Sequence, residues 1–295
     1  MKYKLTGIIA TALVLVGIIV ISFMMPTDNG KRYIEHIDTE EKTPCAGDCS
    51  GILCTHLPIV KIDTQGSEIP GKPIYNHEKQ VMEYTLAEDG STTIKAKVSI
   101  VDNEKVNNHA NDTAKVESLV NIRVRGNSSR HFDKPNYDVE FVNEAGLNNS
   151  LEIMGMDAHH EWALHGPFLD KTLIRNYMWY NISGQLMEYA PNVRFCEVMV
   201  NGEYRGVYLM CETISAGKDG SRITLSIDKK DNTFTGYILR HDRGSNNDIK
   251  NIEPFSIYTF RTDKIINIVS PGAQNLTETL AREISLEFSH FEKAI

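Results

Sequence analysis

The sequence predicts an α+β protein with a strand-rich N-terminal part, preceded by a single transmembrane helix. Three patterns support this prediction. Several short runs alternate apolar and polar residues, which is typical of half-buried strands. Two longer segments place apolar residues at helical spacing, and an uncharged apolar stretch stands near the N-terminus.

Length and composition indicate a globular protein of one or two domains. The chain has 295 residues, of which 41% are hydrophobic and 24% are charged. These are the proportions of folded domains rather than of disordered chains. The net charge is -8, and the sequence contains no long basic run. Because nucleic acids and anionic surfaces attract basic proteins, we expect no nucleic-acid partner.

Residues 1–26 form the predicted membrane anchor. Lys2 and Lys4 precede an uncharged, largely aliphatic stretch over residues 5–26, which is long enough to cross a bilayer as a helix. Lysines before such a stretch favour a cytoplasmic N-terminus, which would place the folded part outside the cytoplasm. A cleaved signal peptide, and hence secretion, is the alternative. Residues 21–25 are bulky and lack a small-residue cleavage site, so the sequence favours an uncleaved, single-pass anchor.

Residues 27–56 are polar and are predicted to form a stalk that carries a cysteine cluster. The cluster consists of Cys45, Cys49 and Cys54. A three-thiolate metal site is one interpretation, with His56 as the nearest fourth ligand, but the spacing does not match a common zinc pattern. The sequence therefore favours a disulfide between two of the three cysteines, and we assign no metal-binding residue.

A strand-rich region is predicted over residues 57–115. Residues 57–62 have the composition of a strand, and Ile94, Ala96, Val98 and Ile100 alternate with polar residues to give another. Turn-forming residues are frequent between these two strands.

A polar turn stands between two further alternating runs, residues 120–124 and 137–141. Gly126 lets the backbone turn, and the side chains that follow it can hydrogen-bond locally. Arg125, Arg130 and Lys134 offer charge-assisted donors, so the turn has the chemistry to hold an anion such as a phosphate. The alternative is an ordinary hairpin with a solvated tip.

The middle of the chain contains a predicted helix and a predicted hairpin. Residues 170–188 repeat apolar side chains at helical spacing behind Asp170, a candidate N-cap. Residues 195–211 contain Asn201-Gly202, a strong signal for a hairpin turn. Cys196 and Cys211 lie on its two strands, and we interpret them as small buried hydrophobic residues rather than as a bridge. Residues 235–240 give one further strand.

The chain ends on a predicted amphipathic helix, in which apolar residues recur at helical spacing from Leu276 to Ile295. No capping glycine, proline or polar tail follows this stripe. We therefore expect the chain to be part of a longer protein.

Four blocks of the chain, taken in order, carry a resemblance to a known family. They are residues 125–130 with Lys134 and Pro135, residues 161–176, residues 200–209 with Glu212, and residues 236–239 with Asp242. With these blocks the chain resembles the CotH family of spore-coat and surface kinases from about Leu57 to its end. Residues 116–295 would then form a CotH kinase-like domain.

The resemblance implies an atypical protein-kinase-like fold that transfers the γ-phosphoryl group of ATP to Ser or Thr with Mg²⁺ or Mn²⁺. The acceptor would be a spore-coat or surface protein. Such transfer depends on positioning and on charge neutralisation. The candidate nucleotide-binding or phosphate-binding residues are Arg125, Asn127, Ser128, Arg130, Lys134, Glu212 and Asp242. Lys134 is the candidate phosphate-binding lysine and Glu212 its candidate partner, and no catalytic residue is assigned.

One part of the family pattern has no counterpart in this chain. In the family, the metal-binding aspartates follow the helix at which this chain stops. A non-catalytic spore-coat or cell-surface assembly protein with the same fold is therefore the alternative function. His159, His160 and His165 are not assigned to a metal site, because adjacent residues point apart on a strand and the metals of phosphoryl transfer prefer oxygen ligands.

Overall fold

The computed structural model describes most of the chain after residue 33. The described residues are 34–45, 47, 49, 51–217, 222–225, 227–228, 233–234, 236–241, 266–270, 272 and 276–294. The predicted anchor, residues 1–26, lies outside them, as does Asp242. None of the helices in the described ranges is long and apolar enough to cross a membrane.

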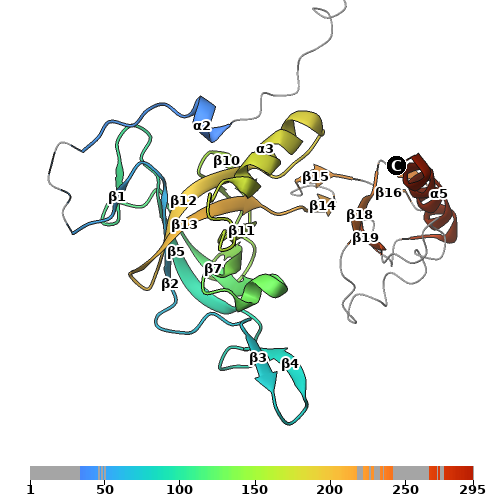
Figure 1. Cartoon of the computed structure of the whole chain (residues 1–295), viewed down its shortest axis with the longest axis horizontal. Helices are drawn as coiled ribbons and strands as arrows, with labels where there is room; N and C mark the ends of the chain where they lie inside the picture. Colours follow the sequence, from blue (N-terminus) through green and yellow to red (C-terminus); the bar gives the residue numbers. More distant parts are fainter. Residues whose placement is uncertain are drawn as a thin grey trace, which may run out of the picture.

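A closed barrel of seven strands forms the centre of the described structure, with the order β11-β13-β12-β2-β5-β7-β8 (Figure 1). Its strands are β2 (Ile59–Asp63), β5 (Ile94–Val101), β7 (Val116–Arg125), β8 (Asn136–Val142), β11 (Glu161–His165), β12 (Val193–Val200) and β13 (Glu203–Glu212). Neighbouring strands run antiparallel except β12 and β2, which are parallel. Closure leaves none of these strands with a free edge.

The main hydrophobic core fills the inside of the barrel. Alternate residues of each strand point inward, as the period of two requires. The largest inward side chains that are fully buried include Trp162, Tyr208, Phe141, Ile122 and Met210. Side chains of this size fill the interior of a small barrel, so the barrel is a packed core and not a channel.

The predicted α+β, kinase-like fold is wrong for the described chain, which is predominantly β, and none of its described helices is the predicted transmembrane helix. Two of its α-helices exceed one turn, α3 (Arg175–Leu186) and α5 (Glu278–Ala294). The alternating runs identified the strands correctly, but alternation carries no information on which strands pair. The barrel takes β2 and β5 from the predicted strand-rich region and its other strands from the predicted CotH kinase-like domain, so both contribute to one core.

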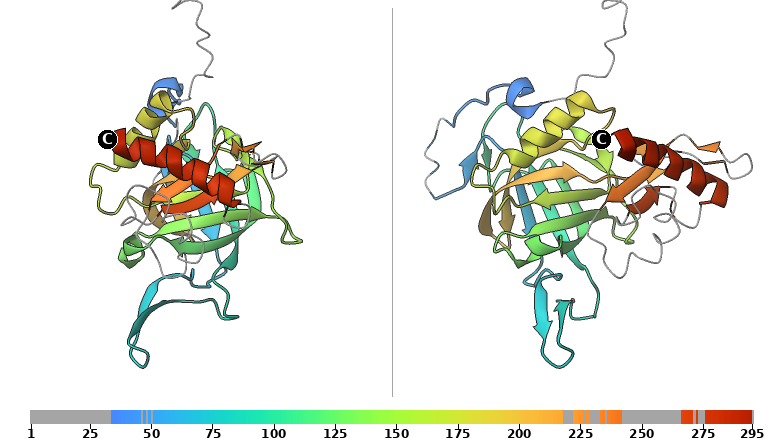
Figure 2. Two further views of the ribbon diagram at one scale, coloured as in Figure 1. Left: turned by 90° about the vertical axis from the view of Figure 1, so that its right-hand side faces the viewer. Right: turned by 45° about the vertical axis from the view of Figure 1, so that its right-hand side comes forward.

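Smaller elements surround the barrel. Two of them are the single turns α2 (Glu35–Asp38) and η1 (Ser128–His131). The paired short strands near the barrel are β1 (Cys54–Thr55) with β6 (Asn108–His109), β3 (Pro73–Asn76) with β4 (Val81–Tyr84), and β9 (Leu151–Ile153) with β10 (Met156–His159). The β3–β4 hairpin projects away from the barrel (Figure 2).

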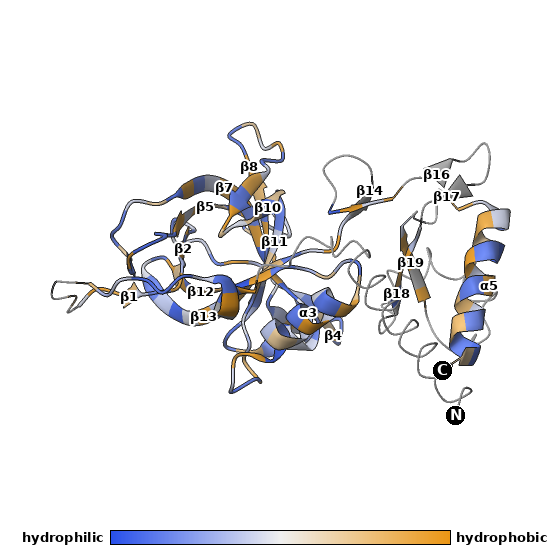
Figure 3. Ribbon diagram, turned by 90° about the horizontal axis from the view of Figure 1, so that it is seen from above, coloured by the Kyte–Doolittle hydropathy of each residue, from blue (hydrophilic) through white to orange (hydrophobic). Residues whose placement is uncertain are grey.

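Three further strand pairs and one helix follow the barrel in the described part of the sequence. The strand pairs are β14 (Ala216–Gly217) with β15 (Ile223–Thr224), β16 (Ile227–Asp228) with β17 (Thr233–Phe234), and β18 (Ile238–His241) with β19 (Ile266–Ser270). Helix α5 packs Leu280 and Ile284 inward, and polar and apolar residues alternate along it (Figure 3). The amphipathic helix predicted at the end of the chain is thus confirmed.

The predicted hairpin at Asn201-Gly202 is confirmed. Strands β12 and β13 pair on either side of it, and Asn201 and Gly202 have φ angles of 51° and 81°. Positive φ at both central residues is the requirement of the tight turn that Asn-Gly favours. The Asn201 side chain also accepts a hydrogen bond from the Thr64 backbone N–H at 2.8 Å, which fixes the hairpin to the end of β2.

The predicted helix over 170–188 begins later than expected, at Arg175. Asp170 lies before its first turn, yet its Oδ2 accepts a hydrogen bond of 2.8 Å from the Arg175 backbone N–H. The apolar stripe of this helix is only partly buried. Tyr177 packs on Phe195 of the barrel, with ring centroids 4.6 Å apart, whereas Ile174 and Leu186 are exposed.

The predicted disulfide in the cysteine cluster is wrong. None of the five cysteines forms a disulfide, and the sulfur atoms of Cys45 and Cys54 lie 3.3 Å apart. A disulfide holds its sulfur atoms at about 2.05 Å. The interpretation of Cys196 and Cys211 as buried residues is confirmed, because both are less than 5% exposed.

The predicted stalk contacts the barrel in its described part. The Phe195 backbone N–H of barrel strand β12 donates to Glu35 Oε2 at 2.9 Å, and the Thr43 backbone N–H bonds at 2.8 Å to the carbonyl of Lys105, in the connection between β5 and β6. Burial raises the pKa of Glu35 from its ordinary 4.5 to about 7, against the lowering effect of its hydrogen bond with Phe195. The neutral carboxyl group is therefore favoured in the folded state.

Replacing Ile122 with Ala should strongly destabilise the barrel. Ile122 is fully buried in β7, and large-to-small changes in a core cost about 2–5 kcal/mol. Arg123→Ala, on the next and outward-facing position, is the matched control and should cost less than about 1 kcal/mol. Urea unfolding measures both, and equal losses would contradict the assignment of the two faces.

Replacing Glu35 with Gln should change the pH dependence of stability. A group whose pKa is raised on folding contributes stability that is present below its unfolded pKa and is lost as pH rises through the folded value. The native chain should therefore lose stability relative to Glu35→Gln between pH 4.5 and about pH 7, by an amount on the order of 3 kcal/mol. Thermal unfolding at pH 4 and pH 8 checks this, and parallel curves would contradict it.

Candidate functional site

A pocket of about 440 Å³ lies between the outer face of the barrel and helix α3. Strands β7, β8, β11 and β13 supply one wall, and α3 supplies the other. Its lining residues are Arg125, Gly126, Asn136, Ala163, His165, Asn176, Tyr180, Pro191, Cys211, Glu212, Thr213 and Ile214. Two of the predicted site residues, Arg125 and Glu212, are thus brought together at this pocket.

The polar hairpin tip between β7 and β8 is held at the pocket by side-chain hydrogen bonds. Gly126 has a φ of 107°, and a Cβ there would clash with the Ser129 hydroxyl, so the position favours glycine. The Asn136 amide donates to Ser129 Oγ at 3.2 Å and accepts from the Gly166 backbone N–H at 2.7 Å. Asn136 therefore joins the tip to the end of β11.

Arg125 is the cationic group on the pocket wall. Its Nε lies 3.1 Å from Asp138 Oδ1, and its side chain is 41% exposed. Asp138 also binds Arg123, through its other oxygen at 3.0 Å. The guanidinium group of Arg125 is therefore oriented by a neighbour while it remains in contact with solvent.

His165 lies on the same wall. Burial lowers its pKa, and the positive charge of Arg125 lowers it further. The imidazole is therefore held neutral near pH 7, with one nitrogen able to donate and the other able to accept a hydrogen bond.

Glu212 forms a buried network at the end of β13. Its carboxylate accepts hydrogen bonds from the backbone and side-chain nitrogens of Asn192 at 2.8 and 3.3 Å, and it lies 3.7 Å from Arg222 Nη1. Arg222 stacks over the Trp162 ring at 4.3 Å. The sequence paired Glu212 with Lys134, whereas the structure pairs it with Arg222.

Lys134 lies beside β13, outside the lining of the pocket. Its Nζ donates to the Val207 carbonyl at 2.6 Å and lies 4.8 Å from the centroid of the Tyr208 ring. Burial lowers its pKa, and the negative charge of Glu197 acts in the opposite direction. A phosphate-binding role for Lys134 stays a prediction.

The other candidates at the hairpin tip have local structural contacts. Arg130 donates to the carbonyl groups of Gly126 and Gly71, the latter at 3.0 Å, and its guanidinium lies 4.3 Å from the centroid of the Tyr84 ring. Asn127 precedes the short η1 turn, which begins at Ser128, and its carbonyl accepts from the Arg130 N–H. Arg130 thereby connects the tip to the β3–β4 hairpin.

The described pocket does not assemble a site for Mg²⁺ or Mn²⁺. These hard cations require several oxygen ligands, commonly one or two carboxylates with phosphate oxygens. Glu212 is the only carboxylate among the described residues that line the pocket, and its oxygens already face Asn192 and Arg222. The residues present therefore fit an anion better than a cation.

The expectation that His159 and His160 point apart is wrong. His159 and His160 stack with ring centroids 4.6 Å apart rather than pointing to opposite sides. His159 ends β10 and His160 precedes β11, so the alternation of a single strand does not apply to them.

Sequence reasoning missed Asn136, His165 and Asn176, which line the pocket. All three lie in or beside the blocks that carry the resemblance, but the chemistry of phosphate binding points first to charged side chains. Neutral amide and imidazole groups give a weaker signal because they are common in loops and strand ends.

Comparison with known proteins assigns a family to the segment of the chain that contains the pocket. The family model described as CotH kinase protein matches residues 122–270, about half of the chain, and this range includes every residue that lines the pocket. The chain belongs to the CotH family. Inner spore coat protein H of Bacillus subtilis (strain 168) is 27% identical over 95 residues, which are 32% of this chain and 24% of that protein. The match to this CotH-family chain thus spans about a quarter of that relative's length.

Removing the Glu212 carboxylate from this CotH-family chain should destabilise it. Glu212→Ala leaves the buried Arg222 without its anionic partner, which costs about 3–5 kcal/mol for buried pairs. Glu203→Ala is the control, because its pair with Arg205 is exposed and should contribute less than about 1 kcal/mol. Chemical unfolding measures the difference, and similar losses would show that the buried network has no special role in stability.

Proposed function

We propose that this chain binds the nucleotide of a CotH-type protein kinase that phosphorylates a spore-coat or surface protein on Ser or Thr. The pocket between the barrel and α3 is the observation that supports this function. It lies within the family-matched segment and has an arginine on its wall. Its volume falls in the range of about 300–1,000 Å³ that is usual for small-molecule sites.

The pocket offers separate surfaces for the two ends of a nucleotide. Ala163, Tyr180 and Ile214 supply apolar surface suited to a base. Arg125 and the amide groups of Asn136 and Asn176 are donors suited to phosphate oxygens. A guanidinium group presents its donors in a fork that matches phosphate geometry, and the bond to Asp138 orients that fork in advance.

The neutral His165 adds a polar contact without adding charge. A neutral imidazole on the pocket wall can bond to a ribose hydroxyl or a phosphate oxygen while Arg125 carries the charge interaction. This chain therefore binds the nucleotide through its own donors. Mg²⁺ or Mn²⁺ is expected only because the family uses it together with ATP.

Replacing Arg125 with Ala should weaken ATP binding. Loss of a hydrogen bond to a charged group costs about 1.5–3 kcal/mol, which corresponds to about 10-fold to 150-fold in the dissociation constant. Arg123→Ala is the matched control, since it removes the other partner of Asp138 but does not line the pocket. Calorimetric titration of ATP into the full chain, with and without Mg²⁺, measures both variants.

The same titration, repeated with Lys134→Ala, tests whether Lys134 rather than Arg125 contacts the phosphate. Weakened binding in Lys134→Ala with unchanged binding in Arg125→Ala would move the phosphate contact to Lys134. Absence of saturable ATP binding in the native chain would remove the proposed function.

A non-catalytic assembly role is the second candidate, and the exposed face of α3 favours it. Trp179 is 61% exposed and Leu186 is 81% exposed, with Ile174 nearby at 50%. Exposed apolar patches often mark protein contacts. Binding to purified coat material that Trp179→Ser abolishes, in a chain that does not bind ATP, would support this candidate over the first.

A further inference from the structure

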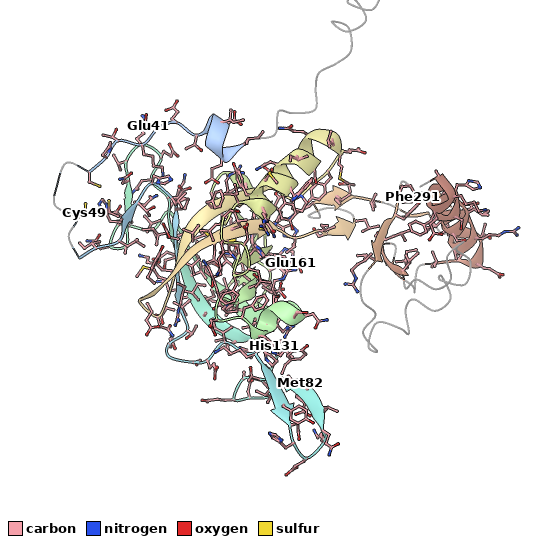
Figure 4. All side chains as sticks on the ribbon, viewed as in Figure 1. Glu41, Cys49, Met82, His131, Glu161 and Phe291 are labelled. Carbon is pink, nitrogen blue, oxygen red and sulfur yellow. The ribbon has the colours of Figure 1, made fainter. Side chains whose placement is uncertain are left out.

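A cluster of three cysteines and one histidine lies at the paired strands β1 and β6 and shares no residue with the pocket. The ligand atoms of Cys45, Cys49, Cys54 and His109 all lie within 4.8 Å of one another. Cys45 Sγ is 3.3 Å from Cys54 Sγ and 3.0 Å from His109 Nε2, and Cys49 Sγ is 3.4 Å from the same nitrogen. Figure 4 places Cys49 at the end of the molecule that carries β1.

These distances fit a metal site better than a set of bonded or unrelated thiols. A tetrahedral zinc ion with Zn–S bonds of about 2.3 Å and Zn–N bonds of about 2.0–2.1 Å has ligand atoms about 3.4–3.8 Å apart. The observed separations are close to those edges, whereas no sulfur pair has the length of a disulfide.

The histidine is oriented from behind by a carboxylate. Asp112 Oδ2 lies 3.3 Å from His109 Nδ1 and accepts the His109 backbone N–H at 2.9 Å. A hydrogen on Nδ1 leaves the lone pair on Nε2, the nitrogen that faces the sulfur atoms. Metal-binding histidines characteristically have such a carboxylate partner. Asn107 also directs its amide toward Cys54 Sγ, at 3.8 Å.

The fold brings His109 to the three cysteines from a distant part of the sequence. Cys45 and Cys49 precede β1, Cys54 lies in β1, and His109 lies in β6 directly opposite Cys54. The strand pairing thereby supplies two of the four ligands in fixed register. The remaining two come from a segment that also pairs Thr43 with Val106, in the connection between β5 and β6.

We propose that Cys45, Cys49, Cys54 and His109 bind one zinc ion in a closed tetrahedral site that fastens the segment before β1 to the barrel. Three thiolates and an imidazole suit zinc and are poor ligands for Mg²⁺ or Ca²⁺. Four protein ligands leave no open position, so the ion is structural and not catalytic. This site is independent of the proposed nucleotide pocket, which shares no residue with it.

Metal analysis of the full chain, purified with reductant and without chelator, tests the site. We expect one zinc per chain, and replacement by Co²⁺ should give the intense visible absorption of a tetrahedral thiolate complex. A chain that contains no zinc and does not take up Co²⁺ would overturn the proposal. A Cys45–Cys54 disulfide in a peptide map made without reductant would also overturn it.

Variants distinguish the proposed ligands from their neighbours. Cys49→Ser and His109→Ala should lose the ion, whereas His56→Ala, an exposed histidine two residues after Cys54, should retain it. Asp112→Asn keeps all four ligands and should weaken zinc binding by about 10-fold to 100-fold, measured by competition with a chromophoric chelator. Because Asp112→Asn removes none of the four ligands, it still tests the site if a ligand variant does not fold. Equal zinc affinity in all four variants would refute the site.

Discussion

The parallel pairing of β2 with β12 is the contact on which the rest of the structure depends. It places Ile59 opposite Glu197 and Ile62 opposite Val200, and so joins the first strand of the barrel to the sixth in sequence. Backbone bonds from Glu197 to Pro58 and from Asn201 to Ile62 extend the junction at both ends. Without this pairing the seven strands would form an open sheet with two apolar edges and no enclosed core.

Barrel closure also determines what its outer surface can do. The inward residues of β11 and β13 are used for the core, which leaves Ala163, His165 and Cys211 on the outside. Helix α3 connects β11 to β12 and must therefore pass over this outer face, where Tyr177 anchors it. The pocket is the space that remains between the helix and the strands. Its polar groups lie at strand ends and at the β7–β8 tip, where backbone geometry is least regular.

Local features of this chain could be predicted from sequence, and long-range ones could not. The Asn201-Gly202 turn and the alternation in β5, β7 and β8 depend on neighbouring residues, so their structures followed from simple rules. Barrel closure and the pairing of Glu212 with Arg222 depend on partners that the spacing does not reveal. His109 was missed for the same reason, since it comes beside the cysteines only through the pairing of β1 with β6, whereas His56 was near in sequence.

The arrangement of the closing strands has a consequence for how the chain folds during synthesis. Strand β2 leaves the ribosome early, but its parallel partner β12 follows only after four other barrel strands and helix α3. Until then β2 can pair with β5 on one side, while its other edge exposes backbone groups next to Ile59 and Val60, which are fully buried in the finished barrel. Such unpaired apolar edges slow folding and promote association between nascent chains. The growing chain is therefore most vulnerable to aggregation in the interval before residue 200 emerges.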